Sequence, residues 1–323
     1  MRLELPVLEQ IRNAAQDIKP YIKRTPLIRS ENLDDILSCN TYFKPECMQF
    51  TGSFKVRGAV NKLLSLTEDE KAGGVITASS GNHAQGVAYA GKVLGVKSTV
   101  VLPLDVAEIK HNGCKAYGAE IIKYGHTSAE RRAKAEEIKN KSGLVSIHSY
   151  DDPVIIAGQG TVGLEILDEL PDTDCIVVPV GGGGLISGVA AAVKEISPNT
   201  RIIGVEPSVV PRYTKSLEEG RPAVVETQNT CADALKAAKA GINNFAFIKK
   251  YVDEIVTVDD DFIVQAFELI TLNAKLLAEL SSCIGVAAVL GGKIKFNRNE
   301  KVVFLLSGGN IDKNKIVEYL KEK

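Results

Sequence analysis

The feature that most constrains the fold of this chain is the stretch CIVVPVGGGGLISGVAAAVKEI, which begins at Cys175. An apolar run typical of a buried strand passes into four glycines, Gly181 to Gly184, and then into a helical pattern that starts with Leu185. Glycines leave backbone N–H groups open, and the first turn of a helix carries partial positive charge. The loop therefore suits an anion of phosphate size, and its surroundings indicate an α/β fold.

Two common nucleotide-binding loops do not fit this stretch. A dinucleotide fingerprint needs G-x-G-x-x-G spacing, and Ile186 and Ser187 stand where its third glycine would fall, although Glu206 closes the next strand as a ribose-binding acid would. The lysine of a P-loop is also absent. A phosphate on another kind of ligand is the preferred interpretation, and a purely structural glycine turn is the alternative.

Short β-rich runs alternate with helical stretches along the chain. The helical stretches include residues 81–94, which Gly95 ends, and 129–141, which Gly143 ends. This alternation predicts βαβ units arranged as two successive doubly wound, open and mostly parallel sheets. The predicted strands are residues 74–77, 98–102, 120–123, 144–147, 175–180, 201–205 and 301–306.

No Pro-rich or Ser-rich linker divides the chain. We expect the chain to cross between domains near residues 65–73 and again near 150–153. A smaller, mobile domain of residues 71–150 is thus predicted to be inserted into a larger domain made of residues 1–70 and 151–323.

The composition excludes several classes of partner. Lys and Arg total 39 and Asp and Glu total 40, so no basic field predicts nucleic acid or an anionic membrane. The longest uncharged run, Cys175 to Val193, contains Pro179 and four glycines, which disfavours a membrane span. Six scattered cysteines without a C-x-x-C pair indicate reduced thiols in a cytoplasmic protein. A small molecule is therefore the expected partner.

The stretch TGSFKVRGA contains a lysine in an unusual setting. Lys55 follows Phe54 and stands among small and apolar residues, whereas a lysine on a solvated face is usually surrounded by polar ones. The plain alternative is a helix start capped by Thr51 or Ser53, with the lysine reaching to solvent.

Two further loops place polar groups after predicted strands. In TASSGNHAQGVAYA the hydroxyls of Ser79 and Ser80, the amide of Asn82 and His83 stand at a helix start, which forms a cradle for a carboxylate. The alternative is an ordinary N-cap. In FLLSGGN a buried strand delivers Ser307 to a glycine turn, which alone would be an ordinary connection.

TGSFKVRGA, SSGNHAQGVA, the four-glycine loop and LSGGN occur in the order and approximate spacing of one enzyme family. The chain resembles the serine/threonine dehydratases and serine racemases, pyridoxal-phosphate enzymes of fold type II that are similar to tryptophan synthase β. RTPLIRS, SYDDP and AGQGTVGLEI match as well, so the resemblance covers nearly the whole chain. It implies pyridoxal 5'-phosphate as cofactor, a small hydroxyamino acid as substrate and a homodimer.

The resemblance also implies roles for individual residues. Lys55 is expected to form the Schiff base with the cofactor and to act afterwards as a base. Phe54 is expected to pack near the cofactor, and Asn82 to bind its ring hydroxyl. The expected phosphate ligands are Gly181, Gly182, Gly183, Gly184 and Leu185.

Substrate contacts follow from the same resemblance. Ser79, Asn82 and His83 are expected to hold the substrate carboxylate. Ser80 matches an acid/base on the opposite face, which racemisation requires and elimination does not. Arg131 aligns with an arginine that reaches the substrate in racemases; the alternative is a solvated helix face.

Ser307 matches the residue that faces the pyridine nitrogen of the cofactor. A hydroxyl does not protonate that nitrogen as an aspartate does, so the ring is a weaker electron sink, which suits prompt loss of a β-hydroxyl. We therefore predict a lyase, an L-threonine/L-serine dehydratase that releases a 2-oxo acid and ammonia. The alternatives are a serine racemase with side dehydratase activity and a weakly catalytic ligand-binding protein with this fold.

Some positions depart from the family pattern. The usual ADG reads Ala232-Asp233-Ala234, Ala237 replaces the serine of racemases, and the usual Glu-Pro is Glu279-Leu280. These changes put the choice of substrate in doubt more than the type of reaction.

The cation site implied by the resemblance is also altered. Its glutamate matches Glu206 and its backbone carbonyl matches Val210, but Arg212 replaces its aspartate. A hard cation prefers several oxygen ligands and little positive charge nearby. No metal site is predicted, and a charge pair between Arg212 and Glu206 is expected instead; the alternative is that Arg212 points to solvent.

Overall fold

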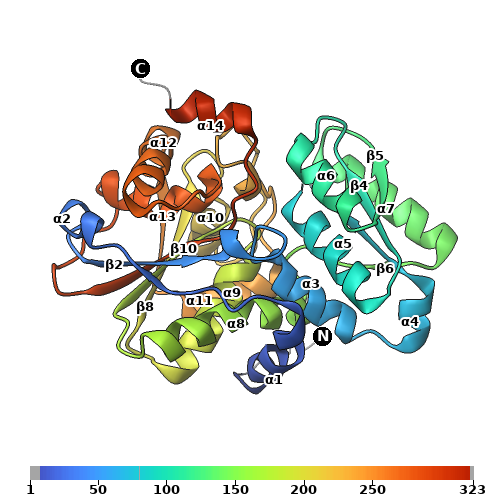
Figure 1. The fold of residues 1–323 in the computed structure, drawn as a ribbon, viewed down its shortest axis with the longest axis horizontal. Coiled ribbons are helices and arrows are strands. Elements are labelled where there is room, and N and C mark those ends of the chain that lie inside the picture. The colour runs from blue at the N-terminus through green and yellow to red at the C-terminus, as the bar shows by residue number, and fades with distance from the viewer. Residues whose placement is uncertain (1–7, 80, 321–323) are drawn as a thin grey trace.

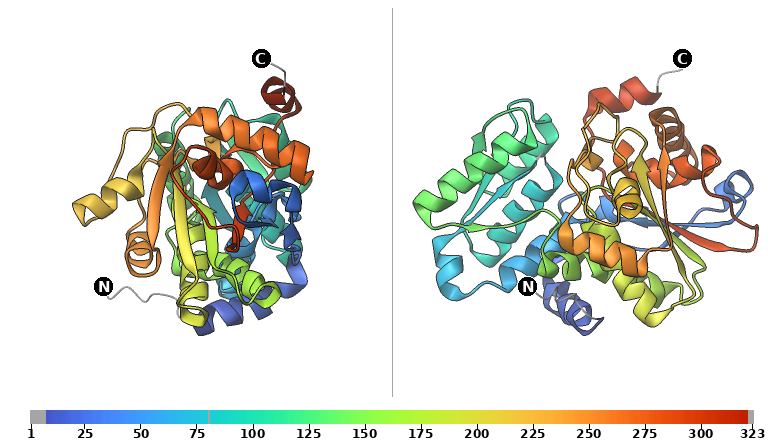
Figure 2. Two further views of the ribbon diagram at one scale, coloured as in Figure 1. Left: turned by 90° about the vertical axis from the view of Figure 1, so that its left-hand side faces the viewer. Right: turned by 180° about the vertical axis from the view of Figure 1, so that it is seen from behind.

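The computed structural model of the protein describes residues 8–79 and 81–320. Two open sheets stand beside each other, and each carries helices on both of its faces (Figure 1). This arrangement confirms the predicted α/β class with two mostly parallel sheets. The view from behind in Figure 2 shows the smaller sheet and its helices to one side of the larger.

The larger sheet has six strands, and its central strands are apolar on both faces, as a sheet covered on both sides requires. Val177 and Phe304 belong to the core on one face, and Ile176 and Val303 to the core on the other. The spatial order of the strands is β1 (Ile28–Arg29), β2 (Asn40–Pro45), β10 (Lys301–Leu306), β7 (Cys175–Pro179), β8 (Arg201–Pro207) and β9 (Glu254–Val258). Strands β1 and β2 pair antiparallel, and the other neighbouring strands pair parallel.

Helices from distant parts of the chain cover this sheet. One face packs against α8 (Pro153–Glu169) and α9 (Gly184–Ile196), and the other against α12 (Asp260–Leu269) and α13 (Leu280–Leu290). The remaining helices of this half are α1 (Leu8–Ile18), α2 (Asp34–Leu37), α10 (Arg212–Glu219), α11 (Ile242–Tyr251) and α14 (Lys313–Leu320).

The smaller sheet has four parallel strands in the order β5 (Glu120–Lys123), β4 (Ser98–Leu102), β3 (Val75–Ala78) and β6 (Val145–Ser146). Val100 and Leu102 pack toward α5 (Asn82–Leu94) and α6 (Glu108–Ala116), whereas Ile76 and Val101 pack toward α7 (Ser128–Ser142). Between the two sheets, α3 (Lys55–Leu64) packs against both α5 and α8. The short α4 (Glu68–Gly73) leads from α3 into β3.

The topology brings three motif loops together. The Ser79 loop follows β3, the glycine loop follows β7, and Ser307 follows β10 directly. Each loop therefore lies at the carboxyl end of a parallel strand, which is where open α/β sheets bind ligands.

All seven predicted strands are present, and their ends shift by at most two residues. The predicted helices begin at Asn82 and Ser128, and Gly95 and Gly143 end them in the left-handed conformation as expected. Three strands were not predicted: β1 is only two residues long, β2 contains a charged Lys44 and a terminal proline, and β9 was overlooked. The predicted domain boundaries remain a prediction, although all four strands of the smaller sheet lie within residues 75–146.

Two other sequence-based expectations concern the cysteines and the membrane. All six cysteines are free. Across residues 8–79 and 81–320, we find no helix with the length and apolar character that crossing a bilayer demands.

Candidate active site

Lys55 is the first residue of α3, and Phe54 precedes it as the N-cap without a side-chain capping bond. The interpretation with Thr51 or Ser53 as N-cap is therefore wrong. The Lys55 amine does not reach to solvent: Nζ donates a hydrogen bond of 2.7 Å to the Ser149 carbonyl and lies 5.0 Å from the centre of the Phe54 ring.

Burial changes the chemistry of this lysine. It lowers the pKa of the Lys55 ammonium from the ordinary 10.5 to about 8, although the charge of Glu279 opposes this shift. A substantial fraction of the amine is therefore neutral near pH 8, and only the neutral amine is a nucleophile. The residue predicted to form a Schiff base thus has the required protonation state.

Buried ion pairs hold α3 in place. Arg57 makes two-pronged contacts with the carboxylates of Glu46 and Glu165, at 2.7–2.9 Å, and a fifth hydrogen bond of 3.1 Å to Thr161. All five guanidinium donors are therefore used. Lys44 lies 2.8 Å from Glu165 and also bonds a backbone carbonyl. These side chains, which the sequence analysis did not single out, anchor the helix that presents Lys55.

The glycine loop leaves no room for side chains. A Cβ on Gly182 would lie 2.2 Å from the ring of Tyr150, and one on Gly183 would lie 2.3 Å from the hydroxyl of Tyr213. Gly183 also has a φ of 95°, in the left-handed region that favours glycine. The loop leads into α9, whose first residues are Gly184 and the buried Leu185. Tight backbone packing at the start of a 13-residue helix is the expected geometry of an anion cradle.

Tyr213 packs against the glycine loop and hydrogen-bonds to it. Its hydroxyl donates to the Gly182 carbonyl at 2.6 Å and accepts from the Gly241 N–H at 3.1 Å. The Tyr213 N–H in turn donates to both oxygens of Glu206, at 3.0 and 3.1 Å. The sequence gives no motif that would reveal this role, because the contact joins residues 31 positions apart.

The expected charge pair between Arg212 and Glu206 is present beside Tyr213. Arg212 is 0% exposed, so the alternative in which it points to solvent is wrong. Its Nε lies 3.4 Å from Oε1 of Glu206, and its Nη2 donates to the Val210 carbonyl at 3.0 Å. Glu206 and the Val210 carbonyl, the two groups that the resemblance matches to cation ligands, thus both contact the guanidinium of Arg212.

The loop before α5 carries the residues predicted to form a carboxylate cradle. Gly81 is the N-cap of α5 and makes no side-chain capping bond, so Ser79 is not the N-cap of this helix. The Ser79 hydroxyl accepts instead from the Gly81 N–H at 3.2 Å. Ser80, the predicted acid/base of racemisation, lies outside the described residues.

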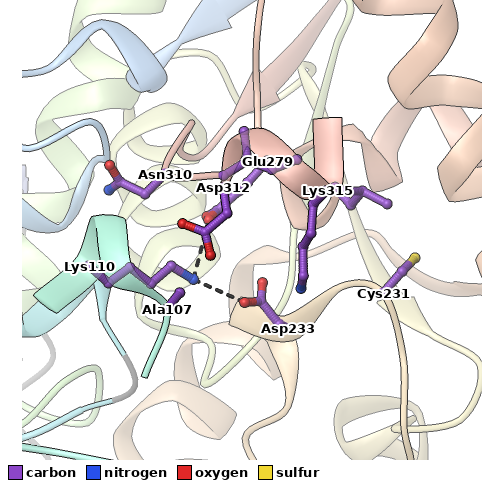
Figure 3. A pocket seen from close by; sticks show the side chains of 10 residues that line it. Ala107, Lys110, Cys231, Asp233, Glu279, Asn310, Asp312 and Lys315 are labelled. Atoms are coloured by element: carbon purple, nitrogen blue, oxygen red, sulfur yellow. Dashed lines mark hydrogen bonds and ion pairs between the residues drawn. The ribbon is translucent and has the colours of Figure 1, made fainter. Parts of the chain in front are cut away.

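Asn82 is engaged with the protein through both ends of its amide. Nδ2 donates to Oε1 of Glu279 at 2.6 Å, and Oδ1 accepts from Asn310 at 2.9 Å. Glu279 and Lys110 line a small pocket, where Lys110 Nζ lies 3.0 Å from Asp233 and 3.8 Å from Oε2 of Glu279 (Figure 3). A ligand that uses the amide of Asn82 therefore exchanges these contacts for its own.

His83 is neutral in this setting. Burial, reinforced by the nearby charge of Lys55, lowers the pKa of His83 to about 3. Its Nε2 lies 3.3 Å from the Ile147 carbonyl, which can only accept, so Nε2 carries the proton and Nδ1 offers a lone pair. His83 thus contributes no positive charge to a carboxylate cradle.

Arg131 is not on a solvated helix face. Its side chain is 5% exposed, and one guanidinium nitrogen donates to the His126 carbonyl at 3.1 Å. The charge of Asp105 also acts on it. The solvated alternative is wrong, and contact with a substrate stays a prediction.

Ser307 lies directly beside the segment that carries Lys55. Its carbonyl accepts from the Phe54 N–H at 3.1 Å, and Gly308 forms a β-bridge with Ser53. Its hydroxyl lies 3.0 Å from that of Ser282, a residue that the sequence analysis did not single out.

The residues present fit the cofactor that the sequence predicts. The glycine loop at the start of α9 suits a phosphate, the partly neutral amine of Lys55 suits an aldehyde, and Ser307 lies beside the segment that carries Lys55. Within the described part of the chain, Ser53 Oγ and His83 Nδ1 are buried without a hydrogen-bond partner. Such groups are expected where a polar ligand binds.

Comparison with known proteins adds independent findings. Residues 18–308 match a family described as pyridoxal-phosphate dependent enzyme. The chain is 43% identical over 309 residues to the L-threonine ammonia-lyase of Thermotoga maritima, covering 96% of this chain and 77% of that protein. It is 42% identical over 312 residues to the catabolic L-threonine dehydratase TdcB of Staphylococcus aureus, covering 96% and 90%. The structure of maize serine racemase matches with a TM-score of 0.92 and 36% identity, covering 97% and 96%.

Proposed function

Because the chain belongs to the family of pyridoxal-phosphate dependent enzymes, we propose that it is an L-threonine/L-serine ammonia-lyase. The reaction removes water from a hydroxyamino acid, and hydrolysis of the resulting enamine releases a 2-oxo acid and ammonia. One water is thus lost and one is taken up, with no oxidant or reductant.

One observation carries this proposal. The amine of Lys55 donates to the carbonyl of Ser149, and the next residue, Tyr150, packs against Gly182 and Gly184. A partly neutral amine and an anion cradle therefore meet at one short segment. This is the arrangement that a lysine-bound cofactor with a phosphate group requires.

Different residues of the chain bind the cofactor, move the proton and orient the substrate. When bound, pyridoxal phosphate supplies an aldehyde for the lysine and an electron-withdrawing ring. The N–H groups of the glycine loop bind its phosphate, and Lys55 takes the proton from the substrate Cα. Ser79 and Asn82 orient the substrate carboxylate through hydrogen bonds, and the neutral His83 adds no charge there.

The test is a substrate screen. The purified protein is incubated with both enantiomers of serine, threonine and 3-hydroxyaspartate, and ammonia, oxo acid and enantiomer ratio are measured. We expect ammonia and oxo acid from L-threonine or L-serine, and expect Lys55→Ala to lose both turnover and the absorbance band of the lysine-bound cofactor. An intact band with no ammonia from any hydroxyamino acid would instead support the ligand-binding alternative.

A serine racemase is the second candidate, which the similarity to the maize enzyme favours. Only racemisation needs a proton donor on the second face of the substrate, the role predicted for Ser80. Ser80→Ala should therefore reduce interconversion of serine enantiomers far more than elimination from the L-form. Equal loss of both activities would leave Ser80 as a part of the carboxylate cradle.

Three broader expectations belong to the same proposal. We infer a homodimer from the resemblance and a cytoplasmic location from the six scattered, unpaired cysteines. We also infer the division into residues 1–70 with 151–323 and a mobile unit of residues 71–150, which the grouping of β3 to β6 in one sheet supports.

A further inference from the structure

The glycine loop is fixed at both ends by the elements that it joins. Before the loop, the Val180 N–H donates to the Val205 carbonyl of β8 at 2.8 Å. After it, the carbonyl of Gly183, the N-cap of α9, accepts the Ser187 N–H at 3.0 Å. The peptide group between Gly182 and Gly183 lies outside both elements, and neither glycine has a side chain that restricts its rotation.

The hydroxyl of Tyr213 holds this peptide group. Its oxygen lies 2.6 Å from the Gly182 carbonyl oxygen and 3.1 Å from the Gly241 nitrogen. The carbonyl can only accept and the backbone nitrogen can only donate, so the phenol proton lies in the contact with Gly182. Burial raises the pKa of Tyr213, so the hydroxyl keeps this proton near neutral pH.

Further contacts keep Tyr213 itself in place. Its side chain is 0% exposed and packs in the core on one face of the larger sheet. The N–H groups of Tyr213 and Thr214, in the first turn of α10, donate to the buried carboxylate of Glu206 at 3.0–3.1 Å. Gly241, the second partner of the hydroxyl, is the N-cap of α11, and Asp151 accepts the first two N–H groups of that helix at 2.9 Å.

We propose that Tyr213 is a positioning residue that fixes the peptide group between Gly182 and Gly183, so that the Gly183 N–H is presented to the cofactor phosphate. The inference rests on the proposed function, in which the glycine loop binds that phosphate. The carbonyl and the N–H of a trans peptide point in opposite directions, so a Gly182 carbonyl held toward Tyr213 turns the Gly183 N–H to the opposite side of the loop. Donation to the carbonyl also polarises the peptide group, which strengthens its N–H as a donor.

The test separates the hydroxyl from the ring and the phosphate from the aldehyde. Tyr213→Phe keeps the ring that packs in the core and removes only the hydroxyl. Dissociation constants are measured by absorbance of the lysine-bound form, for pyridoxal phosphate and for 5'-deoxypyridoxal, which has the same aldehyde but a methyl group in place of the phosphate arm. We expect Tyr213→Phe to weaken binding of pyridoxal phosphate roughly threefold to tenfold, the range for one hydrogen bond, and to leave binding of 5'-deoxypyridoxal unchanged.

Tyr251→Phe is the matched control. Tyr251, at the end of α11, packs against the same core, but its hydroxyl donates to Glu195 at 2.7 Å and not to the glycine loop. Both dissociation constants should therefore keep their native values. Inorganic phosphate gives a second measurement that does not involve Lys55: it should raise the melting temperature of the cofactor-free native protein and of Tyr251→Phe more than that of Tyr213→Phe.

The outcomes separate this inference from the proposed function. Equal weakening of both aldehydes in Tyr213→Phe, or no weakening of either, overturns the role of Tyr213 and leaves the lyase proposal in place. A Tyr213→Phe protein that does not fold has the same meaning, because the hydroxyl then serves the fold as a whole. A native protein that forms no lysine-bound cofactor overturns the lyase proposal and this inference with it.

Discussion

Two clusters of charge flank the candidate site; one is almost wholly buried, and the other is exposed in part at Asp233. The Arg57 cluster consists of Arg57, Glu46, Glu165 and Lys44 and anchors α3 to the six-stranded half. Its guanidinium uses all five donors at 2.7–3.1 Å, and its cations and anions contact one another directly. The cluster is closed, and nothing in it depends on a ligand.

The Glu279 cluster consists of Glu279, Lys110, Asp233 and Asn82 and joins the two halves. Lys110 is 3.0 Å from Asp233 but 3.8 Å from Glu279. Burial raises the pKa of Glu279 to about 7, although the charge of Lys110 opposes this. The Lys110 charge holds the pKa of Asp233 below its ordinary value, although burial opposes that shift.

The difference indicates which part of the site is rigid before ligands arrive. The Arg57 cluster has no spare acceptor or donor on its guanidinium, so it holds Lys55 in one position. In the Glu279 cluster, the Glu279 carboxylate can take up a proton. The amide of Asn82 in the same cluster can exchange its bond to Glu279 for a bond to a ligand. The helix that carries Lys55 is thus held by permanent contacts, and the amide of Asn82, which is predicted to bind the substrate carboxylate, by an exchangeable one.

The largest effect should come from breaking the closed cluster. Arg57→Met leaves Glu46 buried without its cationic partner and Glu165 with Lys44 alone, and we expect the free energy of unfolding to fall by about 3–5 kcal/mol. Urea unfolding measures the loss. Arg24→Met is the control: Arg24 is 53% exposed and pairs with Asp168 at the surface, so it should cost at most about 1 kcal/mol. Equal losses in the two variants would contradict the anchoring role.

A smaller effect, dependent on pH, is expected in the exchangeable cluster. Lys110→Met should cost about 1–3 kcal/mol at pH 8 and less at pH 6, because Glu279 can escape its lost partner by taking a proton. Linkage gives the direction of the pH dependence. A carboxyl group whose pKa is raised on folding binds more protons in the folded state than in the unfolded state. The contribution of Glu279 to the free energy of unfolding therefore falls as pH rises from about 4.5 to 7.

Urea unfolding at both pH values tests this expectation. Lys115→Met, on the exposed side of the same helix, is the matched control and should change little at either pH. A loss in Lys110→Met that does not vary with pH would show that Glu279 stays ionised, as the carboxylates of the closed cluster do.

The rate of cofactor attachment should report on Lys55 alone. Because its pKa is lowered to about 8, the neutral amine forms as pH rises through that value, and the rate should increase about tenfold between pH 7 and pH 9. The measurement is the absorbance of the lysine-bound cofactor after pyridoxal phosphate is added to cofactor-free protein. A rate still climbing at pH 10 would indicate an ordinary lysine.

The smallest effect is expected from metal removal. Arg212 and Glu206 form a buried internal pair at 3.4 Å, looser than those of the closed cluster, and its cation occupies the place of a metal, so chelator should leave activity and melting temperature unchanged. Arg212→Asp should create dependence on a divalent cation, because it adds an oxygen ligand beside Glu206 and Val210. Strong activation of the unaltered protein by magnesium or calcium would contradict this assignment.

Local patterns account for what the sequence predicted well. The apolar runs at residues 175–180 and 301–306 and the four glycines after Val180 have few alternative structures, so the sequence predicts both strands and the turn into α9 correctly. Strand β2 was missed because its Lys44 resembles a surface residue, and its burial depends on the distant Glu165 and on the Thr25 carbonyl. The burial of Arg131 and the contact of Ser282 with Ser307 also depend on the tertiary fold. Local sequence carries no signal for such contacts.

The strand order has a consequence for the synthesis of the chain. Every strand of the smaller sheet is complete by residue 146, whereas β10 stands between β2 and β7 in the larger sheet. During translation the smaller sheet can thus form from contacts within about 70 residues. The larger sheet must wait for residues 301–306, and until then β2 and β7 expose open edges, the features that promote aggregation of nascent chains.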